Sequence, residues 1–142
     1  MGCTESALSR DGNTSVVRVL VLLALCMLID VEACVEQPLS SLMPKVPAFA
    51  RVLKTESPIA WERTFTWLGS FGGSSAKPTL LLSSASRVGE LRRTKPAGPF
   101  KPLVKRKGKQ VTGMNNRLAA SAGYPENLGK AVASRLARRC LG

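Results

Sequence analysis

The sequence predicts a mostly α-helical chain with extensive disorder and no large hydrophobic core. Aromatic residues make up only 5% of the 142 residues, and aromatic side chains bury the most area per residue. The 12 glycines and 9 prolines divide the chain into short elements. The apolar fraction of 44% is concentrated in alanine and in one N-terminal run, so any core elsewhere is expected to be thin.

The first expected element is a short apolar helix inside a targeting segment of residues 1–33. Val19 to Ile29 is an uninterrupted apolar stretch of 11 residues. As a helix it would rise roughly 16 Å, about half of a hydrocarbon core of about 30 Å. That length suits a signal peptide, and Val31-Glu32-Ala33 provides a small-residue cleavage site after Ala33. The alternatives are a short signal anchor, favoured by Arg18 on its N-terminal flank, and a buried core helix.

A second membrane signal lies at the start of the chain. The first six residues, Met-Gly-Cys-Thr-Glu-Ser, fit the pattern for myristoylation of Gly2, and Cys3 is placed for palmitoylation. These residues resemble the dual-acylated start of G-protein alpha subunits, and the resemblance extends no further along the chain. It implies a lipoprotein held by two acyl chains, since one chain gives only marginal membrane residence. The alternative is a chance match to a short pattern.

Residues 34–56 are expected to form a proline-rich linker. Pro38, Pro44 and Pro47 argue against a regular helix or a central strand in this stretch. Its content of serine, alanine and proline, with the sequence Ala-Phe-Ala at 48–50, is similar to plastid-targeting leaders that follow a signal peptide in some algae. That resemblance implies a plastid location as an alternative.

A small, partly helical region is expected over residues 57–93. An amphipathic helix over 57–69 is predicted, with Trp61, Phe65 and Leu68 forming one apolar stripe at helical spacing. Such a stripe is more often a packing surface than a ligand site. Further along, Thr79 to Ser83 favours a short buried strand, and Ser86 to Arg93 favours a weak helix. Its Val88 and Leu91 are expected to point inward.

The net positive charge lies in the last third of the chain. Residues 1–90 hold 8 basic and 8 acidic side chains, whereas residues 91–142 hold 13 basic and 1 acidic. Residues 94–124 contain several prolines and are expected to be a disordered basic arm that does not fold on itself. The candidate contacts to an anionic partner are Arg92, Arg93, Lys95, Lys101, Lys105, Arg106, Lys107, Lys109, Arg135, Arg138 and Arg139.

That partner is either an anionic membrane surface or nucleic acid, and a solvated tail without a partner is the alternative. Only Phe100 and Tyr124 lie near the basic arm in sequence, so stacking on bases would be sparse and nucleic-acid binding non-specific.

Residues 125–142 are expected to form a basic amphipathic helix, with Leu128, Val132 and Leu136 on one stripe. An ordinary surface helix resting on a small core is the equal alternative. The segments from Lys107 to Gly113 and from Arg117 to Val132 are similar to tail segments of mobile-element polyproteins. That resemblance implies that the chain is a fragment.

The residue types argue against catalysis and metal binding. The chain has no histidine and few acids, so no acid–base pair or histidine-based nucleophile can be assembled, and no catalytic or cofactor-binding residue is predicted. No two of its 4 cysteines have the spacing of a zinc site, so no metal ligand is predicted.

We therefore expect a non-catalytic basic protein, membrane-associated or exported, with no small-molecule substrate. The alternatives are a non-specific nucleic-acid-binding polypeptide, which would place it in the nucleus, and a fragmentary reading frame without a defined function.

Overall fold

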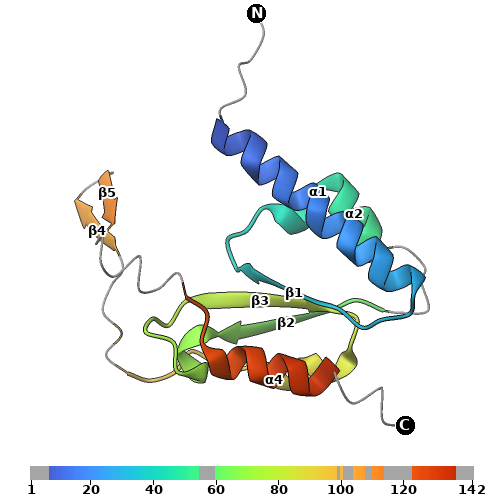
Figure 1. Ribbon diagram of the computed structural model, residues 1–142. Coiled ribbons are helices and arrows are strands. Elements are labelled where there is room, and N and C mark those ends of the chain that lie inside the picture. The colour runs from blue at the N-terminus through green and yellow to red at the C-terminus, as the bar shows by residue number, and fades with distance from the viewer. Residues whose placement is uncertain are drawn as a thin grey trace, which may run out of the picture.

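The computed structural model describes residues 7–54, 60–98, 100, 104–107, 110–113 and 123–136, and gives only the backbone of 7–13, 104–107 and 110–113. Three of the strands described there form an antiparallel sheet (Figure 1). β3 (Pro78–Ser83) is the central strand, flanked by β1 (Cys34–Pro38) and β2 (Glu62–Trp67). The remaining elements are α1 (Ala7–Leu28), η1 (Met43–Lys45), α2 (Pro47–Lys54), η2 (Leu68–Phe71), η3 (Ser86–Leu91), β4 (Val104–Lys107), β5 (Gln110–Gly113) and α4 (Glu126–Leu136).

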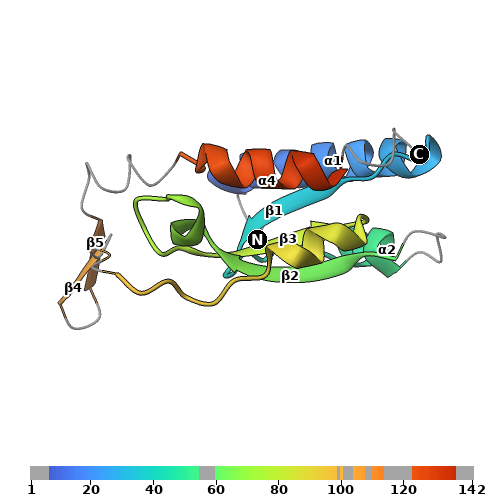
Figure 2. The ribbon, with the colours of Figure 1, turned by 90° about the horizontal axis from the view of Figure 1, so that it is seen from below.

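Helices cover both faces of the sheet, which gives the protein three layers. Figure 1 shows α1 and α2 above the sheet and α4 below it. The 3-10 helix η3 belongs to the lower layer, where Figure 2 shows it beside α4. The central strand β3 is therefore shielded from water on both sides.

The central strand supplies side chains to two separate cores because successive residues of a strand point to opposite faces. Leu80 and Leu82 face the upper layer and are buried with Leu23 of α1 and Phe49 of α2. Leu81 faces the lower layer and is buried with residues of η2, η3 and α4, namely Leu68, Val88, Leu91 and Leu128. A strand buried on both faces is apolar throughout, as the run Leu80 to Leu82 is.

The predicted fold class was wrong. The chain does not form a mostly α-helical, extensively disordered structure without a core, because a three-stranded sheet with a packed core on each face organises it. The expectation of a thin core came from the few aromatic residues. Leucines on a central strand replace them, because each successive leucine serves a different core.

The predicted helix over residues 57–69 is also wrong where the structure describes it. Residues 62–67 form β2, in which Thr64 and Thr66 are buried while Phe65 between them is 45% exposed. Arg-Thr-Phe-Thr-Trp alternates with period 2 and consists largely of β-branched and aromatic residues, which fit a pleated surface. The helical stripe of Trp61, Phe65 and Leu68 was therefore a coincidence of spacing.

Regular structure also occurs in residues 34–56, where prolines predicted a linker. Pro38 ends β1, and an edge strand tolerates proline because one side of it makes no ladder bonds. Pro47 begins α2, a position where the missing N–H has no helical partner to lose. The prolines thus mark the ends of elements.

The strand and helices predicted nearer the C-terminus are confirmed. Thr79 to Ser83 lies in β3, and η3 buries Val88 and Leu91 as expected. The helix α4 buries Leu128 and packs Val132 and Leu136 against the same core. It therefore rests on a small core, as the surface-helix alternative proposed.

Part of the basic arm does fold on itself, contrary to expectation. β4 and β5 pair in antiparallel register, from Val104 opposite Gly113 to Lys107 opposite Gln110. Two residues separate these strands in the sequence, which is the commonest loop length for a hairpin.

The N-terminal apolar segment is a helix, as predicted, and only one of its sides is buried. Leu23 is 4% exposed, and Val19 and Leu20 pack beside it. The alternative of a core helix therefore applies to this side alone. Within the described ranges, no helix is both long and apolar enough to cross a membrane.

Candidate functional site

The outer side of α1 is an apolar surface that faces solvent. Leu22, Leu25 and Leu28 are 61%, 49% and 81% exposed, respectively. Their exposed apolar neighbours are Val17 and Val21 of α1 and Ile29, which directly follows the helix. We call these six side chains the α1 outer face. From Val19 to Ile29 no charged residue interrupts the sequence.

Leaving such a face in water is unfavourable. Complete burial of a leucine, isoleucine or valine side chain contributes about 1.5–3 kcal/mol relative to full exposure. Six partly exposed side chains therefore represent on the order of 5 kcal/mol of unused burial. A contiguous apolar surface of this kind is typical of a protein or membrane contact.

The neighbouring helix presents basic side chains on the same layer. α2 packs against α1 and buries Phe49, while Arg51 and Lys54 in its last turn are exposed. Lys45, just before α2, is exposed as well. The upper layer thus holds exposed cations on the helix that packs against α1, and Arg18 of α1 is exposed as well. Asp30 and Glu32 follow α1 at its C-terminal end.

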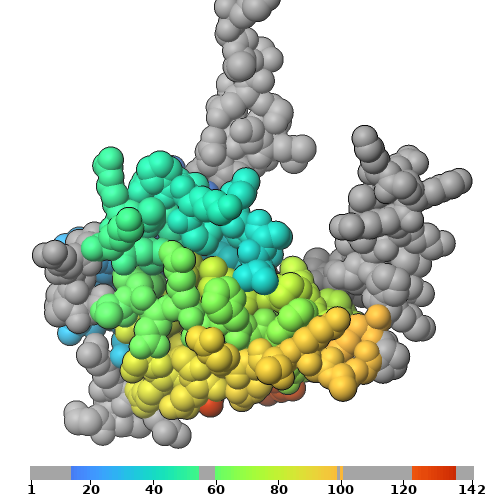
Figure 3. All heavy atoms as spheres, turned by 180° about the vertical axis from the view of Figure 1, so that it is seen from behind, coloured from blue at the N-terminus to red at the C-terminus, as the bar shows by residue number. Residues whose placement is uncertain are grey.

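The basic residues predicted after η3 lie on a different part of the molecule. Arg92, Arg93 and Lys95 are exposed, and the backbone N–H of Arg93 donates to the carbonyl of Phe65 at 3.4 Å. This chain segment therefore runs beside β2. Figure 3 shows it in yellow to orange along the lower border of the rear face, with α2 above. These cations are consequently separated from the α1 outer face.

Two of these cations lie over aromatic rings. The guanidinium of Arg93 lies 5.9 Å from the ring centre of Phe71, and Nζ of Lys95 lies 6.0 Å from that of Trp67. We call these four residues the cation–aromatic edge. Cations within about 6 Å of a ring face are attracted by its quadrupole.

A third ring covers the turn next to this edge. A Cβ atom added to Gly69 would lie 2.7 Å from Cζ of Phe100, so glycine is needed for this close approach. The sequence does not reveal this cluster because Arg93 lies 22 positions after Phe71 and Lys95 lies 28 positions after Trp67. No local spacing pattern links them.

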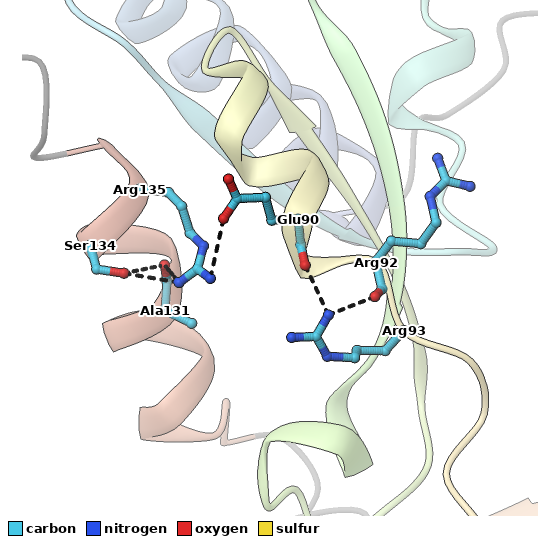
Figure 4. A network of polar contacts seen from close by, with 6 residues as sticks. All are labelled: Glu90, Arg92, Arg93, Ala131, Ser134 and Arg135. Carbon is cyan, nitrogen blue, oxygen red and sulfur yellow. Dashed lines mark hydrogen bonds and ion pairs between the residues drawn. The ribbon is translucent and has the colours of Figure 1, made fainter.

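Arg135 is engaged within the protein. Its Nη2 lies 3.6 Å from a carboxylate oxygen of Glu90, and its Nη1 donates to the carbonyl of Ala131 at 3.3 Å (Figure 4). The Arg93 guanidinium donates to the carbonyls of Glu90 and Arg92, whereas the side chain of Arg92 points away from this network. The three arginines therefore differ in how accessible they are to a partner.

The other predicted contacts are only partly described. Lys105, Arg106 and Lys107 lie in β4, whose backbone alone is described. Gly2, Cys3, Lys101, Lys109, Arg138 and Arg139 lie outside the described residues.

Cys34 is a partly buried thiol rather than a reactive one. Burial raises the pKa of Cys34 to about 11, a hydrogen bond with Ser83 acts in the opposite direction, and the nearby Glu36 raises it further. The thiol therefore stays protonated at neutral pH, where a nucleophile or metal ligand would need the thiolate. In the part of the chain that the structure describes, no group of three or more side chains could hold a metal ion.

Comparison of the chain with protein-family models, with curated protein sequences and with solved structures gave no match.

Proposed function

We propose that this is a non-catalytic protein that binds the surface of anionic membranes through its upper helical layer. The α1 outer face enters the interface between headgroups and acyl chains, and basic residues beside it contact lipid phosphates. The observation that carries the proposal is an exposed apolar side of α1 in the same layer as the exposed cations of α2, the helix that packs against α1. Interfacial helices combine these two features, and their binding strength depends on buried apolar area and on lipid charge.

In this proposal α1 stays attached to the rest of the protein. The backbone N–H of Ala33 donates to Oγ of Ser84 at 2.8 Å, and the Ala33 carbonyl accepts from Oγ of Ser83 at 3.0 Å. Cleavage after Ala33 would also remove Leu23 from the upper core and uncover Leu80 and Leu82. Acylation at Gly2 and Cys3 would strengthen the same attachment.

The test is co-sedimentation of the full chain with vesicles of phosphatidylcholine alone or with added phosphatidylserine. The triple variant Leu22→Ser, Leu25→Ser and Leu28→Ser is expected to lose binding to both. Its matched control is Leu39→Ser with Leu42→Ser, because both leucines are exposed outside α1. Circular dichroism establishes that each variant is folded. Unchanged sedimentation of a folded triple variant would overturn the proposal.

The contribution of charge is tested separately. Each basic residue near an anionic surface contributes about 1 kcal/mol. Arg51→Gln with Lys54→Gln is therefore expected to weaken binding to phosphatidylserine vesicles roughly tenfold or more, and to leave phosphatidylcholine binding unchanged. An equal loss on both vesicle types would contradict the role assigned to α2.

Nucleic acid is a second candidate partner, favoured by the cation–aromatic edge. Exposed cations contact phosphates, and rings beside them can stack on unpaired bases. Arg93 on Phe71 and Lys95 on Trp67 provide both kinds of group on one border of the molecule. Binding of a single-stranded oligonucleotide that is weakened by Trp67→Ala would support this candidate, and binding that Trp67→Ala leaves unchanged would count against it.

A further inference from the structure

A pocket of roughly 330 Å³ lies between α4 and the lower face of the sheet. Its walls are mainly apolar and include Leu81 of β3 with Leu128, Val132 and Leu136 of α4. This volume is at the small end of the range for ligand pockets, which are also mostly apolar with a few placed polar groups. The pocket lies on the face of the sheet opposite the α1 outer face.

One carboxylate faces this apolar space. Glu36 lines the pocket, and its Oε1 atom is buried and has no hydrogen-bond partner. Glu36 is the only acidic side chain among the described residues of the lining. An acceptor that is buried and unpaired is unfavourable by about 1–3 kcal/mol, and more when it is charged.

The lining has two other polar side chains, those of Tyr124 and Cys34. The Tyr124 phenol donates to the Glu36 carboxylate, which raises the pKa of Tyr124 to about 12. The phenol therefore remains a hydrogen-bond donor at neutral pH, as the Cys34 thiol remains protonated. Nζ of Lys77 lies 5.6 Å from the centre of the Tyr124 ring. No described side chain of this lining donates a hydrogen bond to Oε1 of Glu36.

We propose that this pocket binds a small amphiphile made of a protonated primary amine on an apolar chain. The ammonium group donates to Oε1 of Glu36, and the chain packs against Leu81, Leu128 and Val132. An ammonium group suits the site because it has three donors and no acceptor, and because its hydrogen bond to a carboxylate is charge-assisted. A fatty acid of the same length would place a second carboxylate beside Glu36.

The probes are 1-octylamine, 1-octanol and octanoate, which share chain length and differ in the head group. Binding to the full chain is measured by calorimetry at neutral pH, below the concentrations at which the probes aggregate. We expect 1-octylamine to bind about tenfold more tightly than 1-octanol, since a hydrogen bond to a charged group is the stronger one. Octanoate is expected to bind least. Equal affinities for the amine and the alcohol would overturn the proposal.

Two variants locate the binding. Glu36→Gln is expected to remove the preference for the amine while still binding 1-octanol. Ala133→Trp should fill the pocket and abolish binding of both 1-octylamine and 1-octanol. This variant tests the site even if Glu36→Gln does not fold. The matched control is Glu90→Gln, because Glu90 pairs with Arg135 and does not line this pocket. Amine preference retained in folded Glu36→Gln, or binding retained in folded Ala133→Trp, would contradict the assignment.

Discussion

The hydroxyl of Thr66 donates a 2.8 Å hydrogen bond to the carbonyl oxygen of Leu91. This buried bond joins β2 to the last residue of η3, 25 positions away in the sequence. Thr66 is paired with Thr79 on the neighbouring strand β3. The buried hydroxyl of Thr79 has no hydrogen-bond partner among the described residues. Both threonines of this pair are buried, but the Thr66 hydroxyl is hydrogen-bonded and the Thr79 hydroxyl is not.

These two threonines allow a matched pair of substitutions. Thr66→Val leaves the Leu91 carbonyl without its donor and is expected to lower the free energy of unfolding by about 1–3 kcal/mol. Thr79→Val removes an unpaired hydroxyl and is expected to be neutral or stabilising. Urea denaturation of both variants measures the difference. A loss for Thr66→Val that is no larger than the change for Thr79→Val would show that the bond to the Leu91 carbonyl makes no net contribution.

Phe49 of α2 is fully buried in the upper core. Phe49→Ala is expected to destabilise the protein by about 3–5 kcal/mol, because it removes a large buried ring and leaves a cavity. Leu42→Ala is the control, since Leu42 is 70% exposed, and it should change stability by about 0.5 kcal/mol or less. A similarly small change for Phe49→Ala would mean that residues 47–54 behave as the linker predicted from their prolines.

Stability is expected to fall in alkaline solution because of Cys34. Its pKa is about 11 in the folded protein, above the ordinary value of 9.0, so the folded state retains the proton longer than the unfolded state. The stabilisation is therefore complete below pH 9 and is lost as the pH rises toward 11. The loss is of order 2–3 kcal/mol. Thermal denaturation of Cys34→Ala between these pH values should show a smaller decline, and an identical decline would assign the effect to other groups.

Arg92 and Arg135 are expected to differ in their contribution to polyanion binding. Arg135 is paired with Glu90 and bonded to its own helix, whereas the side chain of Arg92 points away from that network. Arg92→Gln should lower the salt concentration that elutes the protein from heparin more than Arg135→Gln does, because a cation already paired releases fewer counterions. Equal shifts would indicate that total charge alone governs retention.

Local patterns predicted some elements well and others wrongly. The strand around Leu81 and the helix α4 were predicted because an apolar run and a helical stripe agree with their surroundings. Residues 61–68 fit two periods, and only pairing of Thr64 opposite Leu81 and Thr66 opposite Thr79 decided for a strand. The apolar segment of α1 was predicted to be a helix, but its neighbours decided which side is buried.

The sequence by itself determined the basic last third, the uninterrupted apolar run and the absence of histidine, since these are properties of composition and order. Only the tertiary structure placed Glu36, Leu81 and Val132 around one pocket and left the outer side of α1 exposed. The physical reason is that burial and pairing depend on contacts between distant segments. Leu22 and Leu23 are adjacent and chemically identical, yet packing against the sheet buries one and exposes the other.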